Sequence, residues 1–180
     1  MKENTLQQET VFRGKLLHVR RDQVELENGH QSVREFCMHP GGVGVLPLTE
    51  DGQVLLVEQF RYAYGAELLE IPAGKLEPGE DPLVCGIREL KEETGCSASE
   101  MIPLGCIYPT PGYVDEKLYL YLARGLTQGE ASPDEGEFLN LHRIPLEELL
   151  KRVMNDEIHD AKTVVAALKT SRLLEEEQHG

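Results

Sequence analysis

The sequence predicts an α/β domain that is preceded by a small antiparallel β-unit. Three observations support this fold class. Residues 9–38 carry only strand patterns, the segment His39-Pro40-Gly41-Gly42 interrupts them, and short apolar strand patterns then alternate with helical patterns. We therefore expect residues 1–39 to form the β-unit and residues 40–180 to form the α/β domain.

Alternation of apolar and polar residues predicts the strands of the β-unit. Asn28-Gly29 favours a tight hairpin turn, and residues 33–38 favour a further strand. The unit has few apolar residues for a core of its own. We therefore expect it to pack on the main domain or on a second subunit. Packing on a second subunit would make the protein a homodimer, which is the oligomeric state that we expect.

The elements of the α/β domain follow from periodicity and from helix-end signals. Pro82 suits the first turn of a helix and Gly95 suits the residue after its end, while Pro145 opens a second helix. The tail after residue 175 is expected to be mobile. Helices are predicted at 81–94, 145–154 and 160–175, and strands at 43–48, 54–60, 68–71, 102–108, 117–123 and 137–143.

Composition limits the classes of function. The 180 residues are 40% hydrophobic and 28% charged, which is typical of a soluble globular protein. The formal net charge of −14 disfavours general binding to nucleic acid or to anionic membranes, since both need Lys and Arg. No signal peptide pattern, apolar run of ~18 residues or CxxC pair occurs, so we expect a cytoplasmic protein with reduced thiols.

Three acidic residues share one face of the helix predicted at 81–94. Glu89, Glu92 and Glu93 lie at i, i+3 and i+4. Like charges at these spacings repel one another by roughly a few tenths of a kcal/mol per pair. Hard divalent cations such as Mg²⁺ prefer carboxylate oxygens and would relieve this repulsion. The alternative is a solvated acidic face that Arg88 stabilises.

These carboxylates belong to a longer fixed pattern. Gly74 is followed by Glu80 after five residues and, after seven more, by the string REL-x-EE-x-G at 88–95. This pattern resembles the Nudix box of the Nudix hydrolases, and a looser resemblance covers most of residues 40–170. It implies a pyrophosphohydrolase with a Nudix α/β/α sandwich and a mixed β-sheet, next to the N-terminal antiparallel β-unit. Two departures are Cys96 at a usually aliphatic position and Gly86 within the helix.

The resemblance implies roles for the residues of the box. Glu89 and Glu93 correspond to the main metal-binding glutamates, and the carbonyl of Ala73, just before the box glycine, to a further metal ligand. Arg88 corresponds to the arginine that orients the carboxylates, and Glu92 lies beside them. The implied cofactor is Mg²⁺, with Mn²⁺ as an alternative.

Supporting positions of the box have their own expected roles. Glu80 is implied to support Arg88. Gly74 and Gly79 are expected to let the loop before the helix turn sharply. Gly86 costs about 1 kcal/mol relative to Ala within a helix, and would allow close packing.

Residues upstream of the box narrow the substrate. The strings VEQFRY at 57–62 and EIPAGK at 70–75 resemble the ADP-ribose pyrophosphatase branch, as does Pro111 downstream of the box. Arg61 corresponds there to a substrate-contacting arginine, although a surface salt bridge is an alternative. Glu116 resembles a residue that contacts the terminal ribose, with an exposed strand residue as the alternative.

Further roles are implied for a loop and for the β-unit. In this branch a loop glutamate is the general base that accepts a proton from the attacking water, and its neighbour two residues on can bind metal. We assign Glu135 as the base and Glu137 as the ligand, with the exchanged assignment left open. Arg34-Glu35 and Leu16 resemble positions that hold the adenosine half, partly across a dimer interface, or they form a plain strand surface.

The predicted reaction is hydrolysis of ADP-ribose to AMP and ribose 5-phosphate. Two alternatives remain: a pyrophosphatase for another nucleoside diphosphate sugar, and a non-catalytic ADP-ribose-binding module.

Overall fold

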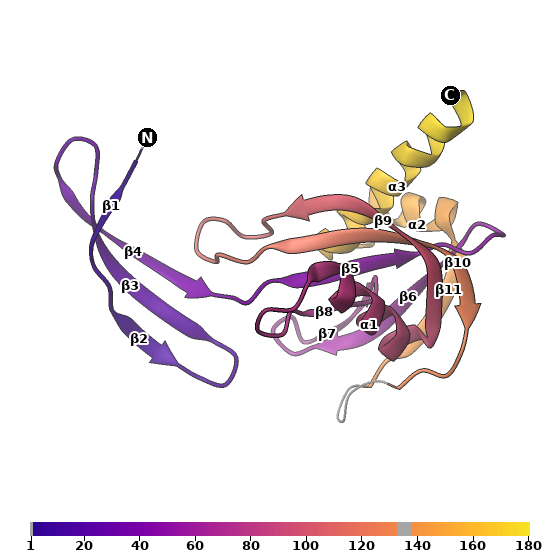
Figure 1. The fold of residues 1–180 in the computed structure, drawn as a ribbon, viewed down its shortest axis with the longest axis horizontal. Helices are drawn as coiled ribbons and strands as arrows, with labels where there is room; N and C mark the ends of the chain where they lie inside the picture. The colour runs from indigo at the N-terminus through magenta and orange to yellow at the C-terminus, as the bar shows by residue number, and fades with distance from the viewer. Residues whose placement is uncertain (1, 133–137) are drawn as a thin grey trace. The chain divides into compact units, whose positions relative to one another are not determined.

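The protein is described by a computed structural model that covers residues 2–132 and 138–180 (Figure 1). The predicted base Glu135 and ligand Glu137 lie outside these residues. The chain divides into two compact units. Unit 1 comprises Met1–Gly41 and Tyr108–Lys117, and unit 2 comprises Gly42–Ile107 and Leu118–Gly180.

Unit 1 is a four-stranded antiparallel sheet built around one central strand. Strand β3 (His18–Glu25) pairs along its length with β4 (Gln31–Met38), and its two ends pair with β1 (Asn4–Gln7) and β2 (Thr10–Arg13). Gly29, at φ +77°, lies in the predicted hairpin turn. The strand patterns of residues 9–38 are confirmed, and β1 is an additional strand that they did not predict.

A segment distant in sequence completes unit 1. The Cys37 N–H donates to the Tyr113 carbonyl at 2.8 Å, and the His39 N–H donates to the Asp115 carboxylate at 2.6 Å. Val24 is the one apolar side chain of the described part of this unit that is fully buried. The expectation of a small apolar core is therefore confirmed.

Unit 2 contains one sheet of mixed strand directions and one antiparallel sheet. The first has the order β8-β5-β10-β9, in which β5 and β10 are parallel and the other pairs antiparallel, and the second has the order β11-β6-β7. The strands are β5 (Gly42–Pro47), β6 (Gln53–Arg61), β7 (Ala66–Glu70), β8 (Ala73–Lys75), β9 (Cys96–Ile107), β10 (Leu118–Gln128) and β11 (Asn140–Pro145).

Helices cover both faces of the first sheet, which gives the predicted α/β/α arrangement. Helix α1 (Pro82–Thr94) packs on Val43 and Val45 of β5 through a cluster that includes Leu90. Helices α2 (Leu146–Met154) and α3 (Ala161–His179) pack on the opposite cluster, which includes Leu46 of β5. Successive residues of β5 point to opposite faces, and this strand is buried throughout.

Three expectations for unit 2 need correction. Strand β8 was not predicted because three residues carry no period. Strand β9 begins at Cys96 rather than at residue 102. The tail expected to be mobile continues α3 to His179, where Arg124 of β10 pairs with Glu177 at 2.8 Å. None of the helices in residues 2–132 and 138–180 is both long enough and apolar enough to span a membrane.

Candidate active site

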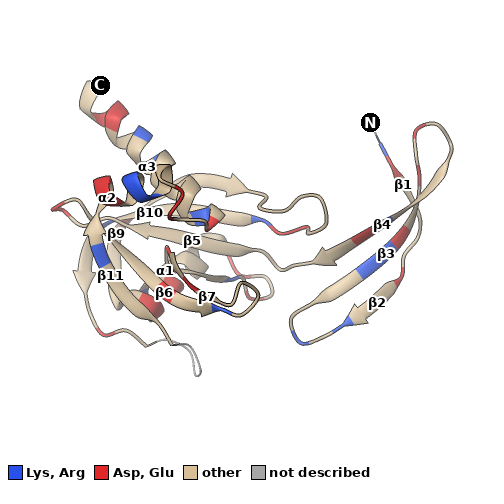
Figure 2. Ribbon diagram, turned by 180° about the vertical axis from the view of Figure 1, so that it is seen from behind, with Lys and Arg blue, Asp and Glu red and all other residues tan. Residues whose placement is uncertain are grey.

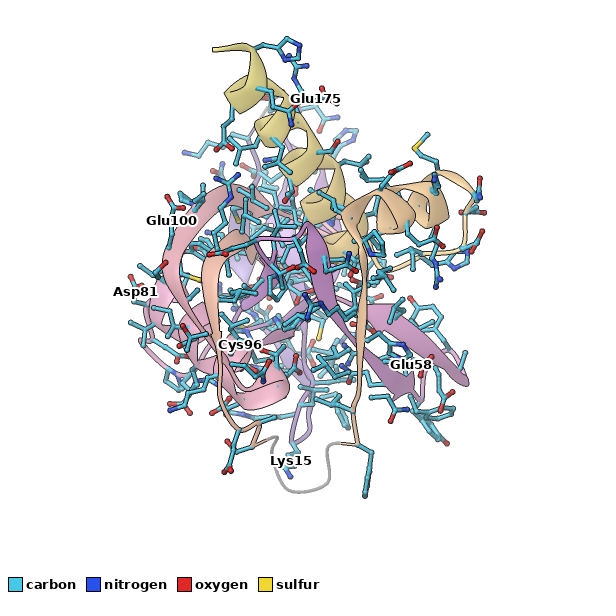
Figure 3. The ribbon with its side chains drawn as sticks, turned by 90° about the vertical axis from the view of Figure 1, so that its right-hand side faces the viewer. Lys15, Glu58, Asp81, Cys96, Glu100 and Glu175 are labelled. Carbon is cyan, nitrogen blue, oxygen red and sulfur yellow. The ribbon has the colours of Figure 1, made fainter. Side chains whose placement is uncertain are left out.

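Helix α1 carries the box carboxylates and is fixed at both ends by its own sequence. The Asp81 carboxylate caps the first turn by accepting from the Leu83 N–H at 2.8 Å, and Gly95 ends the helix at φ +74°. Asp81 and Cys96, which flank the helix, are labelled in Figure 3. A Cβ at Gly86 would lie 3.1 Å from Val43, so this glycine allows the expected close packing on β5.

Two of the three carboxylates on the predicted face are buried. Glu89 is 9% exposed and Glu93 is 7% exposed, whereas Glu92 is partly exposed. A fully solvated acidic face therefore does not describe α1. Buried carboxylates need cations or hydrogen-bond donors to offset the lost hydration.

Arg88 supplies that positive charge to three glutamates, which together with it form the Arg88 cluster. Its guanidinium lies 2.6 Å from Glu89, 3.0 Å from Glu92 and 3.1 Å from Glu80. These interactions raise the pKa of Arg88, so the guanidinium stays charged. The formal charge of the cluster is one positive against three negative, or −2.

Glu80 has the implied supporting role on the far side of Arg88. Its hydrogen bonds with Arg88 and with the Glu77 N–H lower the pKa of Glu80 to about 2. Gly79, at φ +79°, makes the turn that brings Glu80 to this position.

Ala73 and Gly74 place backbone directly against the carboxylates. The Ala73 N–H donates to Glu93 at 3.0 Å, and a Cβ at Gly74 would lie 1.9 Å from Glu89 Oε1. Gly74 was expected to form a sharp turn, but it lies within β8 opposite Val43. Its lack of a side chain instead makes room for Glu89.

Arg61 belongs to a second ionic group, the Glu70 network of Arg61, Glu70, Lys162 and Asp160. Glu70 is 1% exposed and accepts two hydrogen bonds from Arg61, at 2.7 Å and 2.6 Å. Its carboxylate also pairs with Lys162, which pairs in turn with Asp160 at 2.9 Å. Burial opposes the Glu70 charge, but the two cations outweigh burial and hold the pKa of Glu70 below its ordinary value.

The Glu70 network lies within electrostatic range of the carboxylate helix. The hydrogen bonds that Arg61 donates to Glu70 raise the pKa of Arg61, and the charges of Asp160 and Glu93 act in the same direction. Sequence reasoning did not identify Glu70, Lys162 or Asp160 as site residues. The one local signal was a lysine in the first turn of a helix, where acidic residues are usual.

The remaining predicted residues lie in unit 1. Arg34 pairs with Glu3 at 2.5 Å, Glu35 and Leu16 are exposed, and Glu116 lies 3.4 Å from the His39 ring. Their implied substrate roles stay predictions. Figure 2 shows acidic residues on all three helices of unit 2, in line with the net charge.

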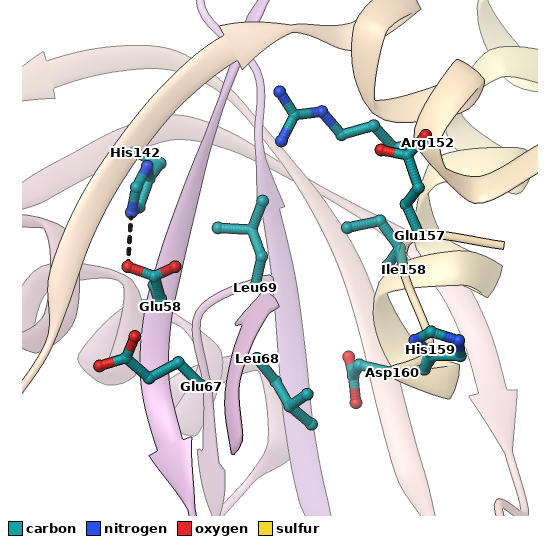
Figure 4. Close-up of a pocket in the computed structure, with 10 residues that line it drawn as sticks. All are labelled: Glu58, Glu67, Leu68, Leu69, His142, Arg152, Glu157, Ile158, His159 and Asp160. Carbon is teal, nitrogen blue, oxygen red and sulfur yellow. Dashed lines mark hydrogen bonds and ion pairs between the residues drawn. The ribbon is translucent and has the colours of Figure 1, made fainter. Parts of the chain in front are cut away.

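A polar pocket of about 290 Å³ opens elsewhere in unit 2 (Figure 4). Its walls come from β6, β7, β11, α2 and the segment before α3, and His142 and Glu58 lie 3.1 Å apart on the neighbouring strands β11 and β6. None of the described residues that we predicted as site residues lines it, although Asp160 of the Glu70 network does.

Two family profiles match the chain. One, described as the NUDIX domain, matches residues 38–166, and the other, described as the nucleoside diphosphate sugar hydrolase N-terminal domain, matches residues 3–36. The chain belongs to the Nudix family.

Relatives of this Nudix protein are similar to it over nearly its whole length. An ADP-ribose pyrophosphatase of Bacillus subtilis is 40% identical over 92% of this chain and 91% of its own. A methanol dehydrogenase activator of Bacillus methanolicus is 43% identical over 91% and 90%. A solved structure described as an ADP compounds hydrolase aligns with a TM-score of 0.86 at 26% identity, covering 98% of this chain and 96% of that one.

Nudix hydrolases generally use divalent metal ions, and the oxygen-rich donor set on α1 fits such an ion. Glu89 and Glu93 would hold it with the Ala73 carbonyl, and Gly74 leaves the space into which Glu89 reaches. Within residues 2–132 and 138–180, no group of three or more His, Cys, Asp or Glu side chains is placed so that it could hold a metal ion.

Proposed function

We propose that this Nudix enzyme hydrolyses ADP-ribose to AMP and ribose 5-phosphate, with Mg²⁺ as the cofactor. The observation that supports this substrate most directly is full-length similarity to relatives with that name. Besides the Bacillus subtilis protein, an ADP-ribose pyrophosphatase of Mycobacterium tuberculosis is 34% identical over 91% of this chain. Both the Nudix domain and the N-terminal unit are therefore covered by the likeness.

The chemistry of the proposed reaction follows from the charges around α1. Bound divalent ions would neutralise the diphosphate and polarise phosphorus for attack by water. Arg88 holds Glu89 and Glu92 in place with bonds of 2.6 Å and 3.0 Å, so that the carboxylates are oriented before substrate arrives. Arg61 would contact the phosphate oxygens with the exposed part of its guanidinium.

Glu135 would accept the proton of the attacking water, and Glu137 would add a metal ligand. If the two glutamates have exchanged roles, Glu137→Gln rather than Glu135→Gln will lower turnover with little change in substrate binding. Comparing kcat and KM of the two variants decides the assignment.

A homodimer is part of the same proposal. Unit 1 exposes several large apolar side chains on its described residues, among them Phe12 at 55% and Leu16 at 57%. Such exposure is more than a small sheet usually leaves to water, and a second copy of the chain would cover it. Light scattering of purified protein should give about twice the 20.2 kDa chain mass, and Phe12→Asp should shift the measured mass toward that of the monomer.

We also propose that the protein is located in the cytoplasm, where its four free cysteines would stay reduced.

The experiment that tests the function is a substrate panel. ADP-ribose, other ADP-sugars, GDP-mannose and dinucleotides are incubated with and without Mg²⁺ or Mn²⁺ in ¹⁸O-labelled water. We expect ADP-ribose to have the highest kcat/KM and the label to appear in one of the two phosphate products. Tight binding of ADP-ribose without product release would instead support a binding module.

A second candidate substrate class is another nucleoside diphosphate sugar. It is favoured by a GDP-mannose pyrophosphatase of Escherichia coli that is 31% identical over 75% of this chain. A higher kcat/KM for GDP-mannose than for ADP-ribose in the same panel would replace the first proposal.

A further inference from the structure

Lys162 departs from two regularities of helix sequences. It is the second residue of α3 after the cap Asp160, in a first turn that contains no acidic residue, and it is 7% exposed. Positive charges are unfavourable at helix N-termini, and lysines are seldom buried unless they are paired. Local departures of this kind concentrate at functional sites.

The partners of Lys162 connect α3 to Arg61. The ammonium group pairs with Asp160 at 2.9 Å and with Glu70, which lies on β7. Glu70 accepts the two hydrogen bonds from Arg61 of β6 with its own two oxygens. One buried carboxylate is therefore shared between a helix lysine and the arginine at the end of β6.

The cap of α3 accounts for the negative charge of Asp160. Its carboxylate accepts from the Thr163 N–H at 3.0 Å and from the Thr163 hydroxyl at 2.5 Å. The positive end of the helix dipole offsets part of this charge. The positive charge of Lys162 can then balance the negative charge of Glu70. Because Glu70 is balanced by Lys162, it does not cancel the positive charge of Arg61.

Arg61 is placed to use that charge. Its side chain is 39% exposed although its Glu70 partner is buried, so part of the guanidinium remains accessible to an anion. A fixed, bidentate arginine also loses less conformational freedom on binding phosphate than a free one.

We propose that Lys162 is a positioning residue, which acts through Glu70 to orient Arg61 and to keep its positive charge available to the diphosphate of the substrate. The inference rests on the proposed function, because it assumes that Arg61 contacts substrate. Lys162 itself is not expected to touch substrate.

The test compares Lys162→Met with variants that separate orientation from folding. We expect Lys162→Met to raise KM about tenfold with kcat within about twofold, and Lys162→Arg to restore KM to within about threefold. In an Arg61→Met background, Lys162→Met should not change KM further, because its route to substrate is gone. The matched control is Lys169→Met, which removes a lysine from the same helix outside the Glu70 network and should leave KM unchanged.

Two results would overturn the proposal. One is an unchanged KM in folded Lys162→Met, and the other is an equal rise in KM with and without Arg61. If Lys162→Met fails to fold, because Glu70 then lacks one of its cations, the double variant Glu70→Gln with Lys162→Met is compared with Glu70→Gln alone. Equal KM values support the proposal, and a further rise in the double variant contradicts it.

The inference and the proposed function can fail separately. The variants are assayed with whichever panel substrate the wild type hydrolyses best, so a wrong substrate assignment does not affect the comparison. A readout without substrate is the ¹H–¹⁵N signal of Arg61 Nε, identified by its loss in Arg61→Met. The signal should shift in Lys162→Met and not in Lys169→Met, and an unmoved signal in Lys162→Met would also overturn the proposal.

Discussion

The Arg88 cluster and the Glu70 network are both ionic groups of unit 2, yet their charges are arranged in opposite ways. In the Arg88 cluster one cation serves three carboxylates and leaves a formal charge of −2. In the Glu70 network two cations and two carboxylates balance to zero. A partly buried cluster with a net negative charge attracts cations, whereas a balanced group of charges does not need a further ion.

This difference assigns different tasks to the two groups. The unbalanced cluster has the charge that a divalent cation would neutralise, so it suits the chemical step. The balanced network has no demand for an ion and instead fixes the orientation of its members. Variants in the first group should therefore change mainly turnover, and variants in the second should change mainly substrate affinity.

The largest effect is expected for Glu93→Gln, which removes the charge of one proposed metal ligand on α1 and keeps the shape of the side chain. We expect kcat to fall by about 100-fold or more in saturating Mg²⁺, while the thermal unfolding midpoint stays near that of wild type. Release of AMP from ADP-ribose is the measurement. Glu100→Gln on β9 is the control, since this glutamate is exposed and lies outside helix α1. Near-normal turnover in Glu93→Gln would contradict the proposal that carboxylates of α1 bind the catalytic metal ion.

A somewhat smaller loss is expected for Gly74→Ala. The new Cβ would fall 1.9 Å from Glu89 Oε1, so the carboxylate must leave its position even though the flexible side chain spares the fold. Activity should drop about 10- to 100-fold, with a higher Mg²⁺ concentration for half-maximal rate. Gly112→Ala is the matched control, because nothing lies near the Cβ it adds. Equal activities of the two variants would mean that Glu89 has no fixed role.

The members of the Arg88 cluster were predictable because they are close in sequence. Arg88 and Glu92 lie four residues apart on one helix, so spacing alone places them together, and the Nudix resemblance implied that Glu80 supports Arg88. The Nudix resemblance then indicated their chemistry, and the fold class followed from strand and helix periods that single segments carry. The α/β/α sandwich was predicted correctly from the Nudix resemblance, and buried β5 and amphipathic α1 are consistent with layers on both sides of the sheet.

The Glu70 network was not predictable, because its contacts join distant segments. Glu70 and Lys162 are 92 residues apart, and no local period pairs a strand end with a helix start. The same limit applies to α3, whose last turns are supported by Arg124 from another element. Strand β8 escaped prediction because its three residues are defined by pairing with β5 rather than by their own pattern.

A pH-dependent effect should distinguish the Arg88 cluster from an ordinary surface pair. The pKa of Glu80 falls from 4.5 to about 2 on folding, so the unfolded chain binds more protons between these values. The stability that Glu80 contributes is fully present above pH 4.5 and is lost as the pH falls toward 2. Arg88→Met should remove this pH-dependent contribution of Glu80 to stability. As the pH is lowered, the unfolding midpoint of the variant should therefore fall less steeply than that of wild type.

The control for this pH dependence is Arg172→Met. This exposed arginine pairs with Glu175 and Glu176 on α3, and exposed pairs contribute little to stability. Thermal unfolding of the three proteins from pH 6 to pH 3 is the measurement. A slope in Arg88→Met that matches both wild type and control would show that Glu80 does not depend on Arg88.

The smallest effect is expected for Cys85, which contacts the Arg88 cluster without sharing its charge. The Arg88 guanidinium donates to the Cys85 sulfur at 3.3 Å, yet burial raises the pKa of this thiol to about 12. The thiol therefore stays neutral and unreactive at physiological pH. Cys85→Ala should keep activity within about twofold and lower the free energy of unfolding by about 1 kcal/mol, as the loss of a small buried group does.

A second measurement is alkylation of the thiols. Iodoacetamide at pH 8 should modify exposed Cys106 and spare Cys85 in the folded protein. Rapid labelling of Cys85 would contradict this prediction, as would a loss of turnover in Cys85→Ala as large as that of Gly74→Ala. Either result would place the thiol within the catalytic group and remove the contrast in charge between the Arg88 cluster and the Glu70 network.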